Sequence, residues 1–336
     1  MAQTETARYA KLSVKYKGKN LNSTINSQTT SFTYTDVASG SSDSIDISIR
    51  NCDKKWITSW LPKKKDKIVP NIILKNWTKN GTSKTFKCGT FAIDDLSFSG
   101  RPLTGKISAV SQPAGDGFSV TNKTKTWKSV TIKEIAKKIA SSANITLVYE
   151  AGSIKIEEIE QSSQPNSTFL YNLCETYGLA MKVYNNKLVI YDEEKYEKKR
   201  AVTTIDETNM ESWSYNDTIT GTYTGAKLSY TDSDSDETIT VTVGTSGRMY
   251  ECSAQAYSKH DAKLKATAAV NKANKEATTM SVTIPANPKI IASCNVRITG
   301  LGKLNGKYFV DAVKHTLGSG YKMSLTMHKV KTRISA

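Results

Sequence analysis

The 336-residue sequence has few of the features that place a chain in a membrane or in an oxidising compartment. No stretch approaches the roughly 20 apolar residues that span a bilayer, and the first residues, MAQTETARYAK, lack the apolar core of a signal peptide. Five cysteines lie far apart and never as Cys-x-x-Cys, which favours buried, reduced thiols over a disulfide or metal framework; they are Cys52, Cys88, Cys174, Cys252 and Cys294. We therefore expect a chain that is made in a cytoplasm and has no membrane partner.

Catalytic patterns are also scarce. The three histidines show neither HExxH nor His-x-His spacing, so they predict no zinc site and no catalytic base; they are His260, His315 and His328. Ser246 lies in GTSG rather than in the GxSxG of a nucleophile elbow. A run of carboxylates on a predicted strand is typical of a solvated face rather than of a glycosidase pair; it comprises Glu157, Glu158 and Glu160.

One acidic run begins like a calcium-binding loop. Asp232, Asp234 and Asp236 alternate, which would let their carboxylates converge on one ion. The pattern then fails, because Glu237 stands where the loop needs glycine and Val243 where it needs a bidentate glutamate. We predict no catalytic residue, no cofactor and no metal site, and hence no enzyme.

Positive charge is the one extreme value of the composition. The formal net charge is +16 at pH 7; residues 1–125 carry 20 basic against 9 acidic residues, and residues 126–200 carry 11 against 10. Such an excess attracts polyanions, so nucleic acid and acidic protein surfaces are candidate partners. Apart from Lys63-Lys64-Lys65 and a few adjacent pairs such as Lys54-Lys55, the lysines are spread singly, and no nucleic-acid-binding motif accompanies them. A solvated strand face is the simpler interpretation, and we expect no specific nucleic-acid partner.

Helical and strand periodicities alternate most cleanly between residues 126 and 191. Thr131 followed by Glu134 predicts a capping box at the start of a helix. Apolar residues then recur at helical spacing, which predicts one buried face; they are Ile132, Ile135, Ala136, Ile139 and Ala140.

A second helix is expected after Pro165. Ser167 is its predicted cap, and Gly178 ends it in the left-handed conformation. Asn185-Asn186 is a turn signal between two short alternating strands, which predicts a hairpin. With further strands at 145–149 and 154–159, these elements predict a compact α+β module.

Short alternating strands and turn residues dominate both flanking regions. In the first region, Asn80-Gly81 predicts a hairpin, and a single helical turn is expected around Trp56 and Trp60. In the second region, Ser258 is expected to cap a long helix that ends near Ala277. Many short strands argue for a barrel or a sandwich in each region.

The expected fold class is α+β, mainly β, in three parts. Residues 1–112 form the first β arm, residues 113–200 the inserted α+β module, and residues 201–336 the second β arm with the long helix. The stretch 111–125, with proline and glycines, reads as the linker into the module, and the charged run 193–200 as the way out of it. Each arm is expected to close into its own antiparallel barrel.

Four segments share an order with a known family. They are KCGTFAIDDLSFSGRPLTGKISAVSQP at 87–113, TWKSVTIKEIAKKIASSANITL at 126–147, STFLYNLCETYGLAMKVYNNKLVIYD at 167–192, and the stretch 261–330 with its Asn-Gly-x-Tyr turn, Val-x-His pair and Gly-Tyr strand. Together they resemble the phage late control D family, the tail hub proteins of contractile tails and related bacteriocins, especially of the Gram-positive prophage type.

This resemblance implies a structural function. It implies a homotrimer whose two tube-protein-like β-barrels per chain make a pseudo-sixfold ring, so that a hexameric tail tube stacks on a trimeric spike. The expected partners are the tail tube protein, the spike protein and other baseplate proteins of a phage tail or R-type bacteriocin, assembled in the bacterial cytoplasm. The premise is a pair of closed sheets at the two ends of the chain, and one continuous sheet between them would contradict it.

Two other classes of function remain open. The sequence around 130–140 is similar to LysM peptidoglycan-binding repeats, which would make the module a cell-wall-binding part of a tail protein. The second predicted helix is too distant and too apolar for that repeat. Nucleic-acid binding is the third class, and it predicts retention on DNA with a steep salt dependence.

Overall fold

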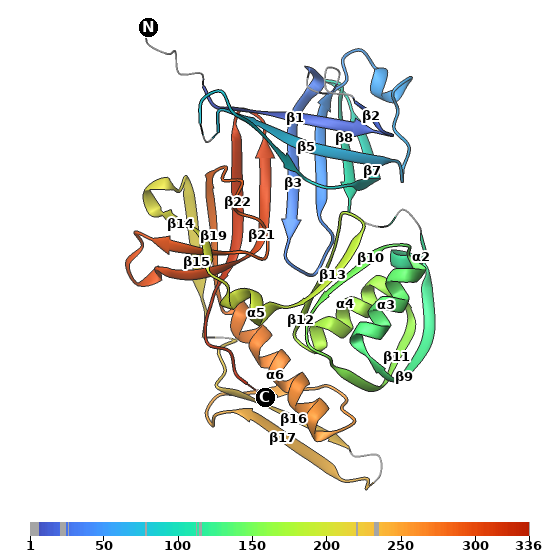
Figure 1. The fold of residues 1–336 in the computed structure, drawn as a ribbon, viewed down its shortest axis with the longest axis vertical. Coiled ribbons are helices and arrows are strands. Elements are labelled where there is room, and N and C mark those ends of the chain that lie inside the picture. The colour runs from blue at the N-terminus through green and yellow to red at the C-terminus, as the bar shows by residue number, and fades with distance from the viewer. Residues whose placement is uncertain are drawn as a thin grey trace.

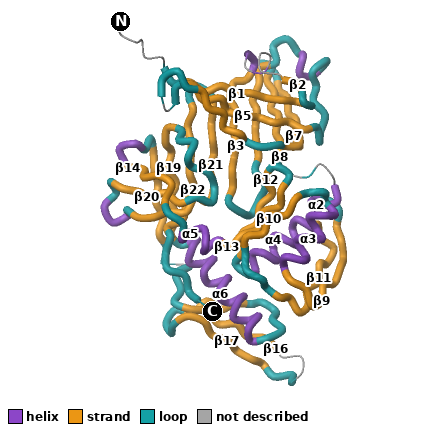
Figure 2. The backbone as a smooth tube through the Cα atoms, in the orientation of Figure 1, coloured by secondary structure: helices purple, strands orange, loops and turns teal. Residues whose placement is uncertain are grey.

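The computed structural model describes residues 7–335 except 21–24, 26, 78, 112, 114, 115, 220 and 232–234. Strands dominate, and the longer helices gather in the half of the molecule that holds the C-terminus, as Figure 2 shows. The prediction of an α+β fold that is mainly β is confirmed. Within the described ranges, no helix has the length and apolar character needed to cross a membrane.

One large sheet contains most of the strands. In the described residues it has 14 strands, in the order β15-β19-β22-β21-β3-β4-β8-β7-β5-β1-β2, with β14, β20 and β6 attached beside this path. From the N-terminal part come β1 (Tyr9–Tyr16), β2 (Lys19–Asn20), β3 (Thr29–Val37), β4 (Ser44–Arg50), β5 (Lys67–Lys75), β6 (Ser83–Lys87), β7 (Phe91–Ser99) and β8 (Thr104–Val110). From the C-terminal part come β14 (Ala201–Asp206), β15 (Ser212–Asp217), β19 (Thr278–Pro285), β20 (Asn295–Thr299), β21 (Gly306–Leu317) and β22 (Tyr321–Lys329). Figure 1 shows the two sets side by side.

The two ends of the chain meet where β3 pairs with β21. The pairing is antiparallel, with Val37 opposite Ala312. The prediction of two separate closed barrels is therefore wrong, because the described strands form one continuous sheet whose path ends at β15 and β2. The core is shared as well, since Ile47 of β4 and Met323 of β22 belong to one buried cluster.

The open edges of the two arms explain this difference. A strand at an open edge carries unpaired N–H and C=O groups, and pairing β3 with β21 satisfies those groups on both strands. Alternating apolar residues show which face of a strand is buried, but they do not show which strand lies beside it. The sequence pattern is therefore compatible with two structures: a separate closed barrel in each arm, or one sheet that contains the strands of both arms.

The module lies beside this sheet and has a core of its own. It contains α2 (Asp116–Ser119), α3 (Ile132–Ser142), α4 (Asn166–Thr176), a ribbon of β9 (Asn122–Thr131) with β11 (Lys155–Pro165), and a sheet of β10 (Thr146–Glu150), β13 (Lys187–Asp192) and β12 (Leu179–Tyr184). Ile135 of α3, Leu170 of α4 and Leu188 of β13 are buried in the same cluster. The predicted stripe of α3 faces this core, as all five of its residues are buried.

Local signals define the ends of α3 and the hairpin. The hydroxyl of Thr131 accepts a hydrogen bond from the Glu134 amide at 3.2 Å, and the Glu134 carboxylate accepts one from the Thr131 amide at 2.8 Å, so the predicted capping box is confirmed. Asn185 and Asn186 have φ angles of 45° and 60° between the antiparallel strands β12 and β13, which confirms the predicted turn.

The helix α4 begins after Pro165 as predicted, but its predicted cap is wrong by two residues. Its N-cap is Pro165 rather than Ser167, and no side chain caps the helix. Pro165 has φ −62° and ψ 153°, an extended geometry that ends β11 and lets the helix begin at Asn166. The predicted end is confirmed, since Gly178 has φ +70° just after α4.

The long helix α6 (Lys259–Glu276) covers a second, smaller sheet made of β17 (Thr238–Gly244), β16 (Gly225–Thr231) and β18 (Met249–Cys252). Ser258 caps α6 as predicted, with its hydroxyl accepting from the Asp261 amide at 3.2 Å. Ala262, Ala266 and Val270 form the buried stripe that packs on this sheet. The short helix α5 (Glu193–Lys198) connects the module to β14 and, in Figure 1, lies next to the start of the second arm.

Candidate functional site

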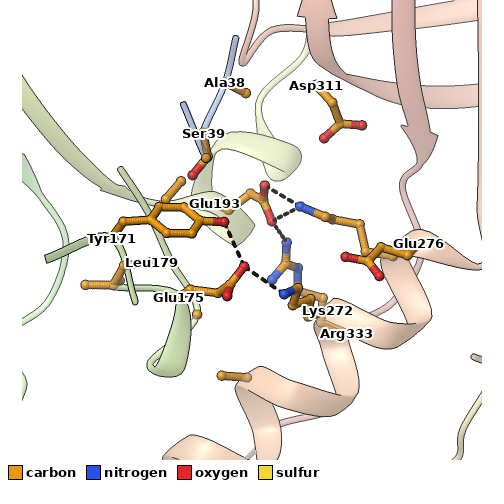
Figure 3. Close-up of a pocket in the computed structure, with 15 residues that line it drawn as sticks. Ala38, Ser39, Tyr171, Glu175, Leu179, Glu193, Lys272, Glu276, Asp311 and Arg333 are labelled. Atoms are coloured by element: carbon orange, nitrogen blue, oxygen red, sulfur yellow. Dashed lines mark hydrogen bonds and ion pairs between the residues drawn. The ribbon is translucent and has the colours of Figure 1, made fainter. Parts of the chain in front are cut away.

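The large sheet, the module and α6 meet at a polar junction. A cavity of about 170 Å³ opens there, with walls from the β3–β4 turn, α4, β12, α5, α6, β21 and the C-terminal segment (Figure 3). We define the polar junction by its charged residues, which are Glu175, Glu193, Glu197, Lys272, Lys275, Asp311, His328 and Arg333.

The β3–β4 turn fastens the module to the large sheet through backbone groups. The Ser39 hydroxyl accepts a hydrogen bond from the Met181 amide at 3.1 Å and donates one to the Met181 carbonyl at 3.3 Å. The Tyr191 hydroxyl donates to the Ala38 carbonyl at 2.8 Å. These bonds fix the position of β12 and β13 relative to the end of β3.

A buried ion triad lies close to this contact. Lys182 Nζ is 2.7 Å from Asp36 Oδ1 and 3.2 Å from Asp43 Oδ1. Burial would lower the pKa of Lys182, but the two carboxylates outweigh burial and raise it. Burial raises the pKa of Asp43 to about 6, although Lys182 opposes that shift. A charged Lys182 therefore ties β12 of the module to both sides of the β3–β4 turn.

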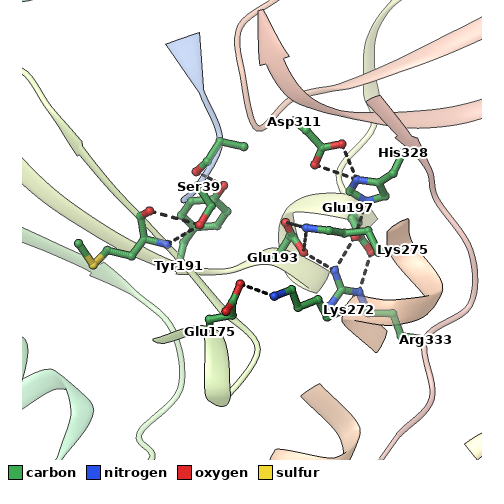
Figure 4. A network of polar contacts seen from close by, with 12 residues as sticks. Ser39, Glu175, Tyr191, Glu193, Glu197, Lys272, Lys275, Asp311, His328 and Arg333 are labelled. Carbon is green, nitrogen blue, oxygen red and sulfur yellow. Dashed lines mark hydrogen bonds and ion pairs between the residues drawn. The ribbon is translucent and has the colours of Figure 1, made fainter. Parts of the chain in front are cut away.

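The C-terminal segment enters the junction through Arg333. Its guanidinium donates from Nε to Glu197 Oε2 at 2.9 Å and from Nη2 to Glu193 Oε2 at 2.8 Å (Figure 4). Lys275 of α6 lies on the other side of Glu193, with Nζ 3.0 Å from Oε1. Burial opposes ionisation of both glutamates, but the cations outweigh it; the pKa of Glu193 is lowered and that of Glu197 falls to about 2. Charge pairs thus join α5, α6 and the C-terminal segment.

His328 extends these contacts into the large sheet. Its Nε2 is 2.9 Å from Glu197 Oε1 and its Nδ1 is 2.8 Å from Asp311 Oδ2. Burial would lower the pKa of His328, but the hydrogen bonds to Asp311 and Glu197 outweigh burial and raise it. An ionised carboxylate only accepts hydrogen bonds, so the ring donates from both nitrogens and carries a positive charge. The charges then balance, three against three: His328, Lys275 and Arg333 face Asp311, Glu193 and Glu197.

A further ion pair of the polar junction joins the module to α6. Lys272 Nζ lies 2.8 Å from Glu175 Oε1, and the Tyr171 hydroxyl donates to the same oxygen at 2.8 Å. Burial alone would raise the pKa of Glu175, but the contacts with Lys272 and Tyr171 outweigh burial, so the pKa is lowered. The Tyr177 hydroxyl donates to Asp261 Oδ1 at 2.6 Å, which anchors the end of α4 to the start of α6.

The arrangement is suited to holding parts together, because the charged groups of the junction are engaged with one another. Among the described residues, no group of three or more His, Cys, Asp or Glu is placed to hold a metal ion. Buried ion pairs contribute little net stability, but separating one is costly. The junction therefore sets the relative position of sheet, module and α6.

Of the histidines weighed from the sequence, only His328 lies in the junction. His315 is buried with Nδ1 2.7 Å from the Tyr321 hydroxyl, and burial lowers its pKa to about 4. His260 is exposed near the start of α6.

The other weighed residues stay apart. Ser246 is exposed in a loop. Glu158 pairs with Lys128 across the β9–β11 ribbon at 3.1 Å, and Glu157 and Glu160 are exposed, as expected for a solvated face. Asp232 and Asp234 of the acidic run lie outside the described residues, and Asp236 follows them. All five cysteines are unpaired thiols; Cys88 and Cys174 are buried, Cys252 and Cys294 half-buried, and Cys52 is exposed, contrary to expectation.

Sequence reasoning did not find the junction. Glu193 and Glu197 are four residues apart and so lie on one face of a short helix, which was the available signal. From the sequence, their charged run indicates only a connection out of the module. The partners His328 and Arg333 lie more than a hundred residues further along the chain, and no local pattern links them to α5.

Comparisons with known proteins relate this fold to solved structures. A family model described as YQBQ-like matches residues 118–328. The prophage MuSo2 43 kDa tail protein from Shewanella oneidensis is similar with a TM-score of 0.71 at 13% identity, over 95% of this chain and 98% of that chain. The tail protein from Neisseria meningitidis MC58 has a TM-score of 0.70 at 14% identity, over 96% and 97%.

A third similar structure comes from a secretion system. It is the E. coli c3393 protein, described as a component of the type VI secretion system with structural similarity to the T4 bacteriophage tail proteins gp27 and gp5. The TM-score is 0.60 at 11% identity, over 96% of this chain and 78% of that chain. No curated protein matches the sequence. At these identities the likenesses show the fold.

Proposed function

The chain belongs to the YQBQ-like family, and on that premise we propose that it is a structural component of a phage-type tail. The observation that carries the proposal is the fold, which a prophage tail protein and a second tail protein share over nearly the whole of both chains. A fold alone hosts many functions, but the polar junction is compatible with this one, because its charge pairs hold the parts of the chain in one arrangement. Such a protein acts through its shape, and we propose no enzymatic activity.

Within the tail, we propose the position of baseplate hub in a contractile injection particle, either a phage tail or an R-type bacteriocin. The supporting observation is the likeness to a type VI secretion component that itself resembles gp27 and gp5. In this position three copies of the chain join a hexameric tail tube to a trimeric spike and contact other baseplate proteins. The chain is assembled into the particle in the bacterial cytoplasm and is then part of the baseplate.

We propose that the chain is organised in three parts, 1–112, 113–200 and 201–336. Their support is the distribution of buried residues: one cluster lies within 118–190, another within 226–270, and the largest combines both arms. The two arms are not proposed to form separate closed barrels, because their strands belong to one sheet. The fit to tube and spike instead depends on how the shared sheets of three copies pack together.

Purified tail particles provide the test. We expect quantitative mass spectrometry to find three copies of the chain per particle, and cryo-electron microscopy to place them between tube and spike. Particles that lack the chain would overturn the tail function. Another copy number or another position in the tail would overturn the hub assignment alone. Retention of the purified full-length chain on peptidoglycan, without incorporation into particles, would support the wall-binding alternative.

A further inference from the structure

The connection between β4 and β5 carries an exposed apolar cluster. Ile57, Trp60 and Leu61 keep 40%, 37% and 50% of their surface exposed within five residues of sequence. Single exposed apolar residues are ordinary, whereas a contiguous group of large ones marks an interaction surface. Figure 1 shows this connection at the end of the molecule opposite to α6, far from the polar junction.

This connection is held in one conformation. Its 3-10 turn, Lys55–Ile57, is anchored by Trp56, which is buried to 3% exposure. The Trp56 amide donates to Asn51 Oδ1 at 3.1 Å, and the Asn51 amide donates to the Leu103 carbonyl at 3.0 Å. The rings of Trp56 and Trp60 meet edge to face with centroids 5.8 Å apart. A surface that is already ordered loses little entropy when a partner binds.

An apolar cavity lies behind the turn. Its volume is about 380 Å³, and its lining includes Trp56, Trp60, Leu61, Pro62, Ile93 and Ile107. Pockets that bury a ligand have volumes of about 300–1,000 Å³. The cavity is therefore large enough to receive a bulky apolar side chain from outside.

Lysines surround the cluster. Lys54, Lys63 and Lys64 are exposed and form no ion pair within the described part of the chain. The two neighbouring carboxylates are engaged within the chain: Asp53 lies 3.1 Å from Lys55 Nζ, and Asp66 lies 3.1 Å from the ammonium of Lys17, in the turn after β1. The surface therefore carries an excess of positive charge that attracts an acidic partner.

We infer that this surface is a docking site for an acidic protein segment that inserts an apolar side chain into the cavity. We call it the tryptophan turn and define it by Trp56, Ile57, Trp60 and Leu61 with Lys54, Lys63 and Lys64. The inference rests on the proposed function in one respect, namely that the segment belongs to another protein of the same particle. Apolar anchors in a pocket supply the affinity, and the lysine rim supplies orientation and rate of association.

The geometry favours a protein over nucleic acid or a membrane. Base stacking needs an open aromatic face, but Lys55 Nζ lies over the Trp60 ring at 4.8 Å from its centroid, and Trp56 is in edge-to-face contact with Trp60. Membrane-surface binding relies on a long amphipathic helix, and the helical turn here has three residues. A pocket with a charged rim is the form expected for a protein segment.

Particle incorporation tests the inference. The wild-type gene is replaced by W60A/L61A or by K63E/K64E, and copies of the chain per purified particle are counted by mass spectrometry. Both variants should lower incorporation about tenfold or more. The matched controls are W213A, which removes a tryptophan that is 42% exposed on β15, and K133E/K137E, which reverses two exposed charges on α3. Both controls should incorporate like the wild type.

The outcomes separate this inference from the proposed function. Wild-type incorporation of both tryptophan-turn variants would overturn the docking site and leave the tail function intact, whereas absence of the wild-type chain from particles would overturn the tail function. Melting temperatures of the purified chains show whether each variant folds. Photo-crosslinking provides a second readout. With p-benzoylphenylalanine in place of Leu61, the chain should capture an acidic peptide of another particle protein. Capture of nucleic acid, lipid, a basic peptide or a second copy of this chain would overturn the inference.

Discussion

His328 and Glu197 lie 131 residues apart in the sequence, yet Nε2 of the histidine is 2.9 Å from Oε1 of the glutamate. The contact joins β22 of the large sheet to α5, through which the chain leaves the module. Arg333 donates to the same carboxylate from the C-terminal segment. One buried glutamate therefore links three segments, and its partners offer direct tests of how the parts are held.

The charge on His328 makes stability depend on pH. Its pKa is raised in the folded chain above the unfolded value of about 6.5. Its contribution is therefore fully present below about pH 6.5 and is lost as the pH rises through the raised folded value, because the proton that both carboxylates hold is then released. Free energies of unfolding from urea titrations should fall over this range in the wild type and stay flatter in H328Q. Equal slopes in both proteins would contradict the assignment.

His315 should act at the opposite end of the pH range. Burial lowers its pKa to about 4, so the folded chain binds its proton less tightly than the unfolded chain does. Its contribution to stability is present above about pH 6.5 and is lost as the pH falls from there towards about 4. Titration of the His315 ring by NMR in the folded chain should give a midpoint near 4. A midpoint near 6.5 would show that the ring is not buried as described.

Removing the Arg333 guanidinium should destabilise the whole chain. R333M leaves Glu193 and Glu197 buried with fewer partners, and breaking a buried pair costs about 3 kcal/mol. Urea denaturation gives this loss directly. R297M is the matched control, since Arg297 is exposed on β20 and its replacement should change stability by less than about 0.5 kcal/mol. A loss in R333M no greater than in the control would argue against the network.

Lys182 should be essential for the contact between the module and the β3–β4 turn. K182M leaves Asp36 and Asp43 buried without their cation, which should cost about 3 kcal/mol or more near neutral pH. The loss should shrink as the pH falls below about 6, because the Asp43 carboxyl is then protonated and no longer needs a cation. K187M, an exposed position on the same hairpin, is the control. A loss that does not depend on pH would point to packing rather than charge.

The capping box predicts a local effect within the module. T131A removes the side-chain acceptor for the Glu134 amide and should cost about 1 kcal/mol. Hydrogen exchange should increase most in the first turn of α3. S141A, exposed near the end of the same helix, should leave exchange and stability almost unchanged. An equal increase in hydrogen exchange across the whole chain would mean that α3 does not unfold locally, apart from the rest of the chain.

Helix caps and tight turns were predictable because they depend on residues only a few positions apart. Thr131 with Glu134, Gly178, the Asn185-Asn186 turn and Ser258 all took the predicted conformations, because a side chain or a positive φ meets its requirement within the same turn. The predicted cap at Ser167 is wrong, although this prediction also depended only on neighbouring residues. A proline two residues earlier had already set the backbone that begins α4.

The sequence by itself determined the strand-rich composition, the capped starts of α3 and α6, the end of α4, the Asn185-Asn186 turn and the excess of basic residues in the first arm. The tertiary structure decided that β3 pairs with β21, so that the arms share one sheet, and that Glu197 meets His328 and Arg333. A period-two pattern specifies the buried face of a strand but does not specify which strand pairs with it. A buried charged residue contacts its partner only after distant segments of the chain have packed together.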